Sequence, residues 1–238
     1  MPIAPKILQK NSREFVFNTT INSLEPHRKE SSKLVFDKNY LRSSALKLAQ
    51  KGYYHEAIAL LNKLLDRDSN NAIDYNNRGL IYFQSGEKQK AFCDYNTAIQ
   101  LNLKLVAAYN NRANYYVSCG DLAAAIADYE RAINLNPTYI RARINRGITL
   151  RDLGQYEEAI DNFEIALLFG QLEAYILAEC GRTHHLWGDW NCALTAYNRA
   201  STLLSRIDAK KEVFSYRLHL QLESWLNELL LLQNFNAH

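Results

Sequence analysis

Five glycines recur along this chain at a constant step of 34 residues, and five alanines keep the same step. The glycines are Gly52, Gly86, Gly120, Gly154 and Gly188, and the alanines are Ala57, Ala91, Ala125, Ala159 and Ala193. A fixed period of this size is typical of a solenoid, in which one small supersecondary unit is stacked again and again. We therefore expect the 238 residues to share one continuous core rather than to divide into globular domains.

Each period contains the residues that two packed helices need. With the glycine at position 15, the units span 38–71, 72–105, 106–139, 140–173 and 174–207. Positions 8 and 20 are Gly or Ala in every unit, whereas position 24 carries a large side chain, namely Leu61, Tyr95, Tyr129, Phe163 or Tyr197. Small residues let antiparallel helices approach closely, and glycine supplies the turn. The pattern predicts helices at 38–51 and 54–67, 72–85 and 88–101, 106–119 and 122–135, 140–153 and 156–169, and 174–187 and 190–203, without strands.

This arrangement of small and large positions resembles the tetratricopeptide repeat (TPR) family, over residues 38–207. The resemblance implies an all-α solenoid, a right-handed superhelix of antiparallel helix pairs. The sequence departs from the family at position 32, where Pro137 is the only proline, and in the first unit, where Tyr40 precedes the usual aromatic position by one residue. The Asn-Arg-Gly-rich consensus is similar to bacterial, particularly cyanobacterial, TPR proteins, which include photosystem assembly factors.

The two ends of the chain differ from the repeats. Residues 208–238 carry apolar residues at spacings of three and four, such as Leu218, Leu222 and Trp225, which predicts an amphipathic helix. We expect it to cap the last unit, or alternatively to pair with a second subunit, so that the protein is a monomer or a dimer through this helix. Residues 1–37 form a polar arm that is either disordered or docked on the solenoid through the apolar segment 15–17.

Composition and motifs argue against catalysis. The net charge of +3 is too small to indicate nucleic-acid binding, and no apolar run is long enough for a transmembrane helix. The N-terminus lacks an apolar segment of the secretory kind, and the cysteines form no CxxC pair or zinc spacing. No phosphate loop or nucleophile motif occurs. We therefore expect a cytoplasmic protein with no catalytic residue, no metal and no cofactor.

In the TPR family the first helix of each unit lines a concave groove, and the resemblance places a row of asparagines there. They are Asn76, Asn77, Asn110, Asn111, Asn114 and Asn145. An amide side chain both donates and accepts hydrogen bonds, so such a row is suited to the main chain of an extended peptide. The alternative is that these asparagines brace neighbouring helices, because buried amides need partners.

Three arginines map to the same concave positions: Arg141, Arg151 and Arg182. A mildly basic groove favours an acidic segment or a C-terminal carboxylate through charge-assisted hydrogen bonds, and the alternative is a solvated charged face. Outside the groove, we expect ion pairs within units between Arg78 and Asp94 and between Arg112 and Asp128, at positions 7 and 23. The fourth unit has Asn162 at position 23, so its arginine needs another partner.

These features predict a non-catalytic adaptor or assembly factor that holds a segment of a protein or peptide partner in its groove. Assembly at a membrane, with peripheral association, is a narrower hypothesis. One alternative is a regulatory subunit that senses a peptide or controls an enzyme or transcription factor. Another is an RNA-binding solenoid, which requires basic and aromatic residues interleaved on one face, whereas the rings here occupy packing positions.

Overall fold

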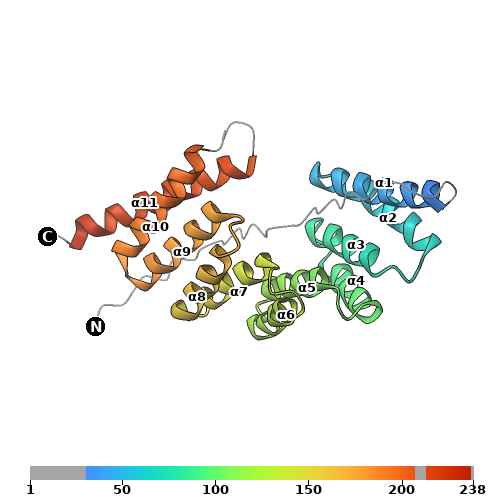
Figure 1. Ribbon diagram of the computed structural model, residues 1–238, viewed down its shortest axis with the longest axis horizontal. Coiled ribbons are helices and arrows are strands. Elements are labelled where there is room, and N and C mark those ends of the chain that lie inside the picture. Colours follow the sequence, from blue (N-terminus) through green and yellow to red (C-terminus); the bar gives the residue numbers. More distant parts are fainter. Residues whose placement is uncertain (1–30, 207–212, 237–238) are drawn as a thin grey trace.

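The computed structural model describes residues 31–206 and 213–236, and this part of the chain is all-α (Figure 1). Its helices are α1 (Ser31–Gln50), α2 (Tyr54–Arg67), α3 (Ala72–Gln84), α4 (Lys88–Leu101), α5 (Val106–Cys119), α6 (Leu122–Leu135), α7 (Ile140–Asp152), α8 (Tyr156–Leu167), α9 (Glu173–Trp187), α10 (Trp190–Arg206) and α11 (Val213–Asn236). The first helix begins at Ser31, earlier than the expected residue 38. The expectation for the apolar segment 15–17 lies outside the described residues.

The helices pair in sequence and stack into an arch (Figure 1). Each unit packs its first helix against its second, as α3 does against α4, and then against the helices of the next unit. Within the described ranges, the first helices α1, α3, α5, α7 and α9 also contact one another from unit to unit, whereas the second helices α2 to α8 do not. In a curved stack the layer with direct contacts between units is the inner one, so the first helices form the inner layer.

The repeated glycine performs the role that its spacing indicates. At position 15 the five glycines all have positive φ angles, from 78° to 91°, and each lies at the turn between the paired helices. This left-handed region disfavours residues with a Cβ atom. A different requirement applies at position 8, where a Cβ built on Gly181 would lie 2.6 Å from a ring carbon of Tyr197. Close approach of the two helices therefore depends on this second glycine.

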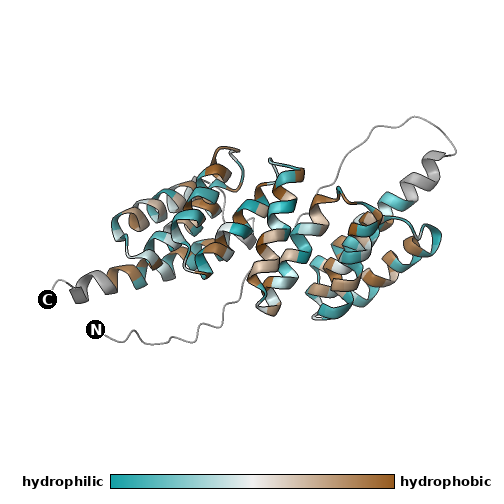
Figure 2. Cartoon of the chain, turned by 90° about the horizontal axis from the view of Figure 1, so that it is seen from below, coloured by the Kyte–Doolittle hydropathy of each residue, from teal (hydrophilic) through white to brown (hydrophobic). Residues whose placement is uncertain are grey.

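The core lies between the paired helices. The rings at position 24, such as Tyr95, Tyr129 and Phe163, are almost completely buried, and the alanines at position 20 are fully buried. Figure 2 shows hydrophilic and hydrophobic residues mixed along most helices, as expected for helices that are buried on one side only. The large ring in each unit fills the space that the small residues leave open.

Arginines at position 7 connect each middle unit to the one before it. Arg78 forms a two-pronged ion pair with Asp94, at 2.8 and 2.7 Å, and also donates to Asn62 of the preceding unit at 2.8 Å. Arg112 repeats this arrangement with Asp128 and Asn96. Both predicted ion pairs are therefore confirmed.

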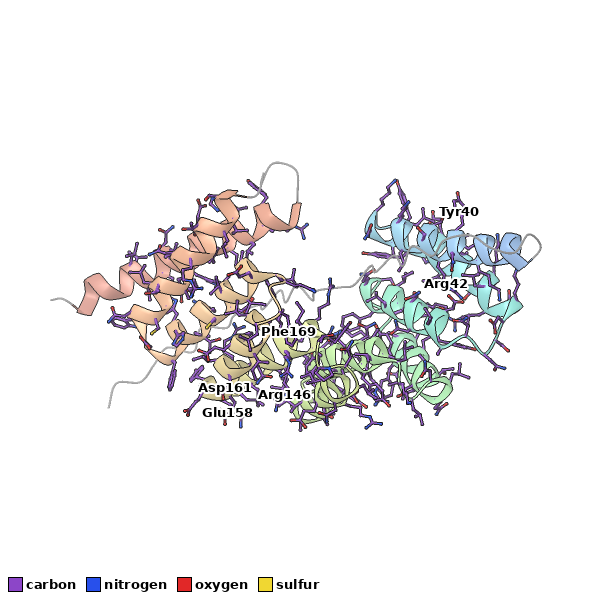
Figure 3. The ribbon with its side chains drawn as sticks, in the orientation of Figure 1. Tyr40, Arg42, Arg146, Glu158, Asp161 and Phe169 are labelled. Atoms are coloured by element: carbon purple, nitrogen blue, oxygen red, sulfur yellow. The ribbon has the colours of Figure 1, made fainter. Side chains whose placement is uncertain are left out.

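Arg146 makes the same two contacts, but the amide and the carboxylate have changed places. It donates to Asn162 within its unit at 3.1 Å and to Glu130 of the preceding unit at 2.7 Å. Figure 3 places Arg146 on the side of the arch away from its hollow. The carboxylate is therefore at position 25 of the preceding unit instead of position 23 of the same unit. Glu130 is thus the partner that could not be assigned to this arginine from the sequence. We call this three-residue contact the position-7 bridge.

The last helix, α11, covers the end of the stack. It contacts both α9 and α10, and its Leu218, Leu222 and Leu229 are buried. Trp225 stacks on Tyr197 of α10 with ring centroids 6.0 Å apart. The helix therefore caps the fifth unit, as predicted. Within the described part of the chain, no helix combines the length and the apolar character that crossing a bilayer requires.

Candidate partner-binding surface

The nine residues predicted to line the groove all lie on the inner-layer helices α3, α5, α7 and α9. They differ sharply in exposure and in hydrogen bonding. Asn76, Asn110, Asn111, Asn114 and Asn145 are buried, and so is Arg182, whereas Asn77, Arg141 and Arg151 are half-buried. By exposure, the groove residues therefore divide into six buried and three half-buried side chains.

Four of the buried amides form a chain of hydrogen bonds across three units. The Nδ2 of Asn145 donates to Asn110 at 3.1 Å, Asn110 donates to Asn111 at 3.3 Å, and Asn111 donates to Asn76 at 2.9 Å. Asn145 also donates to Asn114 at 3.3 Å. We call this arrangement the asparagine chain. Its contacts run from one unit to the next and are of the bracing kind.

Two amide groups of the row remain open to further bonds. Asn77 forms no side-chain hydrogen bond with the described residues and is half-buried. The Oδ1 of Asn114 accepts from the Tyr129 hydroxyl at 2.6 Å, but its Nδ2 is buried and has no hydrogen-bond partner among the described residues. An unpaired buried donor is costly, so this Nδ2 group is a candidate for contact with a bound acceptor, which would reach it only after the side chains that cover Asn114 shift.

Two of the three groove arginines are paired within the protein. Arg151 donates to Glu179 of the next unit at 2.5 Å, and Arg182 donates to Glu228 of α11 at 2.7 Å. At the other end of the stack, Arg42, which is labelled in Figure 3, forms a two-pronged ion pair with the buried Asp74 of α3. Several charged side chains of the inner layer are thus already paired with a neighbouring unit or with the cap.

Arg141 at the start of α7 differs from the other two. Its Nη1 is buried and has no hydrogen-bond partner among the described residues. Burial lowers the pKa of this guanidinium, while neighbouring Tyr139 acts in the opposite direction. A half-buried arginine without an acceptor can bind a carboxylate with two parallel hydrogen bonds.

His185 is a buried part of this layer that was not among the nine predicted groove residues. Its Nδ1 lies 3.3 Å from Nη1 of Arg182 and 3.4 Å from the Tyr197 hydroxyl. Arginine can only donate, so Nδ1 is the acceptor and the imidazole is neutral. Burial, followed by the charge of Arg182, lowers the pKa of His185, while Glu228 opposes this.

These features define a class: an α-helical repeat protein of the solenoid type, with a polar inner layer. Tetratricopeptide repeat models match residues 44–111, 106–139 and 128–161. The chain belongs to the tetratricopeptide repeat family. Members of this family are scaffolds for protein–protein interaction.

Solved structures agree with this fold. TTC0263, a thermophilic TPR protein of Thermus thermophilus, is 18% identical with a TM-score of 0.66, over 79% of this chain and 98% of that one. MamA is 23% identical with a TM-score of 0.57, over 66% and 92%. YrrB, described as a TPR protein with an unusual peptide-binding site, is 20% identical with a TM-score of 0.53, over 81% and 96%. No curated protein sequence matches the chain significantly.

Proposed function

We propose that this protein is a cytoplasmic, non-catalytic adaptor that binds an acidic segment of a partner protein along its inner layer. Arg141 is the anchor, and Asn77 and Asn114 contact the main chain of the bound segment. The asparagine chain holds α3, α5 and α7 at the spacing that this contact requires. Assembly of a larger complex is the proposed use of the binding.

The observation that carries this proposal is the unpaired guanidinium of Arg141. Arg151 and Arg182 have carboxylate partners at 2.5 and 2.7 Å, whereas Nη1 of Arg141 is buried with no acceptor among the described residues. A bound carboxylate would supply that acceptor and offset the cost of burial. An aspartate, a glutamate or a free C-terminus provides this chemistry.

The amides support an extended ligand. Asn77 on α3 is half-buried and without a side-chain hydrogen bond to the described residues, and Asn114 on α5 retains an unpaired donor. Together with Arg141 on α7, they come from three successive inner helices. An extended segment that crosses these helices would meet polar groups at intervals, as its own repeating N–H and C=O groups require.

A phage-displayed peptide library tests the proposal directly. We expect the wild-type protein to enrich peptides rich in Asp and Glu, and Arg141→Gln to abolish this enrichment. Arg131, an exposed arginine on the outer helix α6, provides the matched control, and Arg131→Gln should select the same peptides as the wild type. Binding should weaken as salt concentration rises, because the contact is partly exposed.

Equal selection by Arg141→Gln and the wild type would contradict the proposed anchor. Capture from cell extract, with and without nuclease, provides the second arm. A partner that is lost after nuclease treatment would favour the RNA-binding alternative over the peptide adaptor.

A further inference from the structure

The turn between α9 and α10 brings together three side chains that are suited to binding a metal ion. A ring nitrogen of His184, a carboxylate oxygen of Asp189 and Sγ of Cys192 all lie within 4.8 Å of one another. We call this group the α9–α10 corner. Imidazole nitrogen, carboxylate oxygen and thiolate sulfur are the ligand types that Zn²⁺ takes in proteins.

Two of the three side chains are held in place by neighbouring structure. Oδ1 of Asp189 accepts a hydrogen bond from the backbone N–H of Cys192 at 3.1 Å and so caps the N-terminus of α10. Its other oxygen, Oδ2, faces Nδ1 of His184 at 3.6 Å. The imidazole itself stacks on Trp187, whose ring in turn stacks on Tyr156 of α8. Asp189 and His184 are therefore aimed at one point before any ligand binds.

Nδ1 of His184 has no hydrogen-bond partner within residues 31–206 and 213–236. This atom is buried, and no hydrogen-bonding group of the described residues lies within bonding distance, since Oδ2 of Asp189 is too far away at 3.6 Å. Buried polar atoms are nearly always satisfied in native proteins. A cation placed between Nδ1, Asp189 and Cys192 would satisfy this nitrogen.

The second unit carries a cation at the equivalent corner. The three residues of the corner occupy positions 11, 16 and 19 of the fifth unit. The same positions of the second unit carry Tyr82, Glu87 and Lys90. There, the Lys90 ammonium lies 2.5 Å from Glu87 and 5.3 Å from the centre of the Tyr82 ring. In the fifth unit the lysine is replaced by cysteine and the tyrosine by histidine. The corner thus loses its ammonium group, and both replacements are metal ligands.

We propose that the α9–α10 corner binds a divalent zinc ion through His184, Asp189 and Cys192. In a tetrahedral zinc site the ligand atoms lie roughly 3.3–3.8 Å apart, as zinc–ligand bonds of about 2.0–2.3 Å require. The corner therefore needs a contraction of about 1 Å, which a small rotation of the exposed Cys192 side chain can supply. The thiolate favours zinc over magnesium or calcium, and water takes the fourth position.

Such a site would replace the part of a missing contact that joins the two helices within one unit. The fifth unit has Cys180 at position 7, so it cannot form the position-7 bridge that joins the three middle units to their neighbours. A zinc ion shared by α9 and α10 would instead fix the two helices of this unit to each other. The proposal is independent of the proposed function, because none of its ligands takes part in the partner-binding surface.

Cobalt(II) titration of the full chain under reducing conditions is the test. We expect one ion to bind per chain, with thiolate-to-cobalt charge-transfer absorption in the near ultraviolet that disappears when zinc displaces cobalt. Cys192→Ser should abolish this band, and His184→Gln should weaken binding by at least about tenfold, since losing even a group that only orients a ligand costs that much. Cys119→Ser, which removes an exposed cysteine outside the corner, should leave the band unchanged.

Thermal unfolding provides a readout that does not depend on the cobalt spectrum. Zinc should raise the melting temperature of the wild type and of Cys119→Ser but not that of Cys192→Ser, because a ligand stabilises only the state that binds it. Far-ultraviolet circular dichroism would establish that each variant is folded. Absence of the band in the wild type, its survival in Cys192→Ser, or its loss in Cys119→Ser would each overturn the proposal.

Discussion

Arg182 and Glu228 connect the last repeat to the cap, with Nη1 of Arg182 donating to Oε2 of Glu228 at 2.7 Å. The same guanidinium lies over the Trp225 ring, 5.5 Å from its centre. An arginine expected to face a partner therefore contacts α11 of its own chain. The inner layer at this end is closed by the cap, and the accessible part of the surface lies on α3, α5 and α7.

The cap should contribute strongly to stability. Leu222 is fully buried against the fifth unit, so Leu222→Ala should lower the free energy of unfolding by about 2–5 kcal/mol. Leu220, on the same helix, is 47% exposed, and Leu220→Ala should cost less than about 0.5 kcal/mol. Urea unfolding followed by circular dichroism measures both. If Leu222→Ala were silent and Leu220→Ala assembled differently from the wild type, α11 would be a dimerisation helix rather than a cap.

Stability should fall at mildly acid pH because of His185. Its folded-state pKa is lowered, whereas the unfolded chain binds a proton with a pKa of about 6.5. The contribution of His185 is therefore complete above about pH 6.5 and is lost as the pH falls from there through the folded-state pKa. The free energy of unfolding measured between neutral and mildly acid pH should show this slope. His185→Gln should flatten it, and an unchanged slope in that variant would assign the effect to another group.

The asparagine chain separates bracing from binding. Asn111→Ala leaves Asn76 without its donor and Asn110 without its acceptor, so it should cost about 1–3 kcal/mol of stability. Asn77→Ala removes a half-buried amide that has no side-chain hydrogen bond to the described residues. It should change stability by less than about 0.5 kcal/mol while weakening peptide binding. The free energy of unfolding and the affinity for the peptide are to be measured on both variants. If Asn77→Ala lowered stability and Asn111→Ala weakened only binding, the roles of these two residues would be exchanged.

The repeat register can be tested at two nearby sites on α6. Ala125 is fully buried, so Ala125→Leu should overpack the contact between the paired helices and cost about 1–3 kcal/mol. Ala123 on the same helix is exposed, and Ala123→Leu should be nearly neutral. Melting temperatures measure the difference. Similar values for the two variants would mean that position 20 does not face the helix pair.

The fold could be predicted in detail because the residues that determine the helices and turns recur at the same positions in each unit. Gly120 has a φ of 82° and lies at the turn between α5 and α6, as its place in the period indicates. The Arg112–Asp128 pair followed from positions 7 and 23 of a single unit. The start of α1 at Ser31 was not predicted, because residues 31–37 lie outside the 34-residue period.

The site was harder to predict, because its contacts cross from unit to unit. Glu179 meets Arg151 and Glu228 meets Arg182 only after the stack has curved and the cap has docked. Position within one unit places Asn111 on the inner layer but does not reveal that Asn76 of the previous unit accepts from it. The closeness of His184, Asp189 and Cys192 was not predicted for a related reason: the turn geometry brings them together, and their spacing matches no recognised metal motif.

The position-7 bridge makes the middle of this protein extendable. Each arginine reaches to its own position 23 and to position 25 of the unit before it. A tandem copy of residues 106–139 would present Glu130 to the arginine of whichever unit followed, just as Arg146 meets it now. Gene duplication could thus add a unit at this point without any substitution in the neighbouring units. The first and fifth units lack the arginine, so the array of bridged units ends at them.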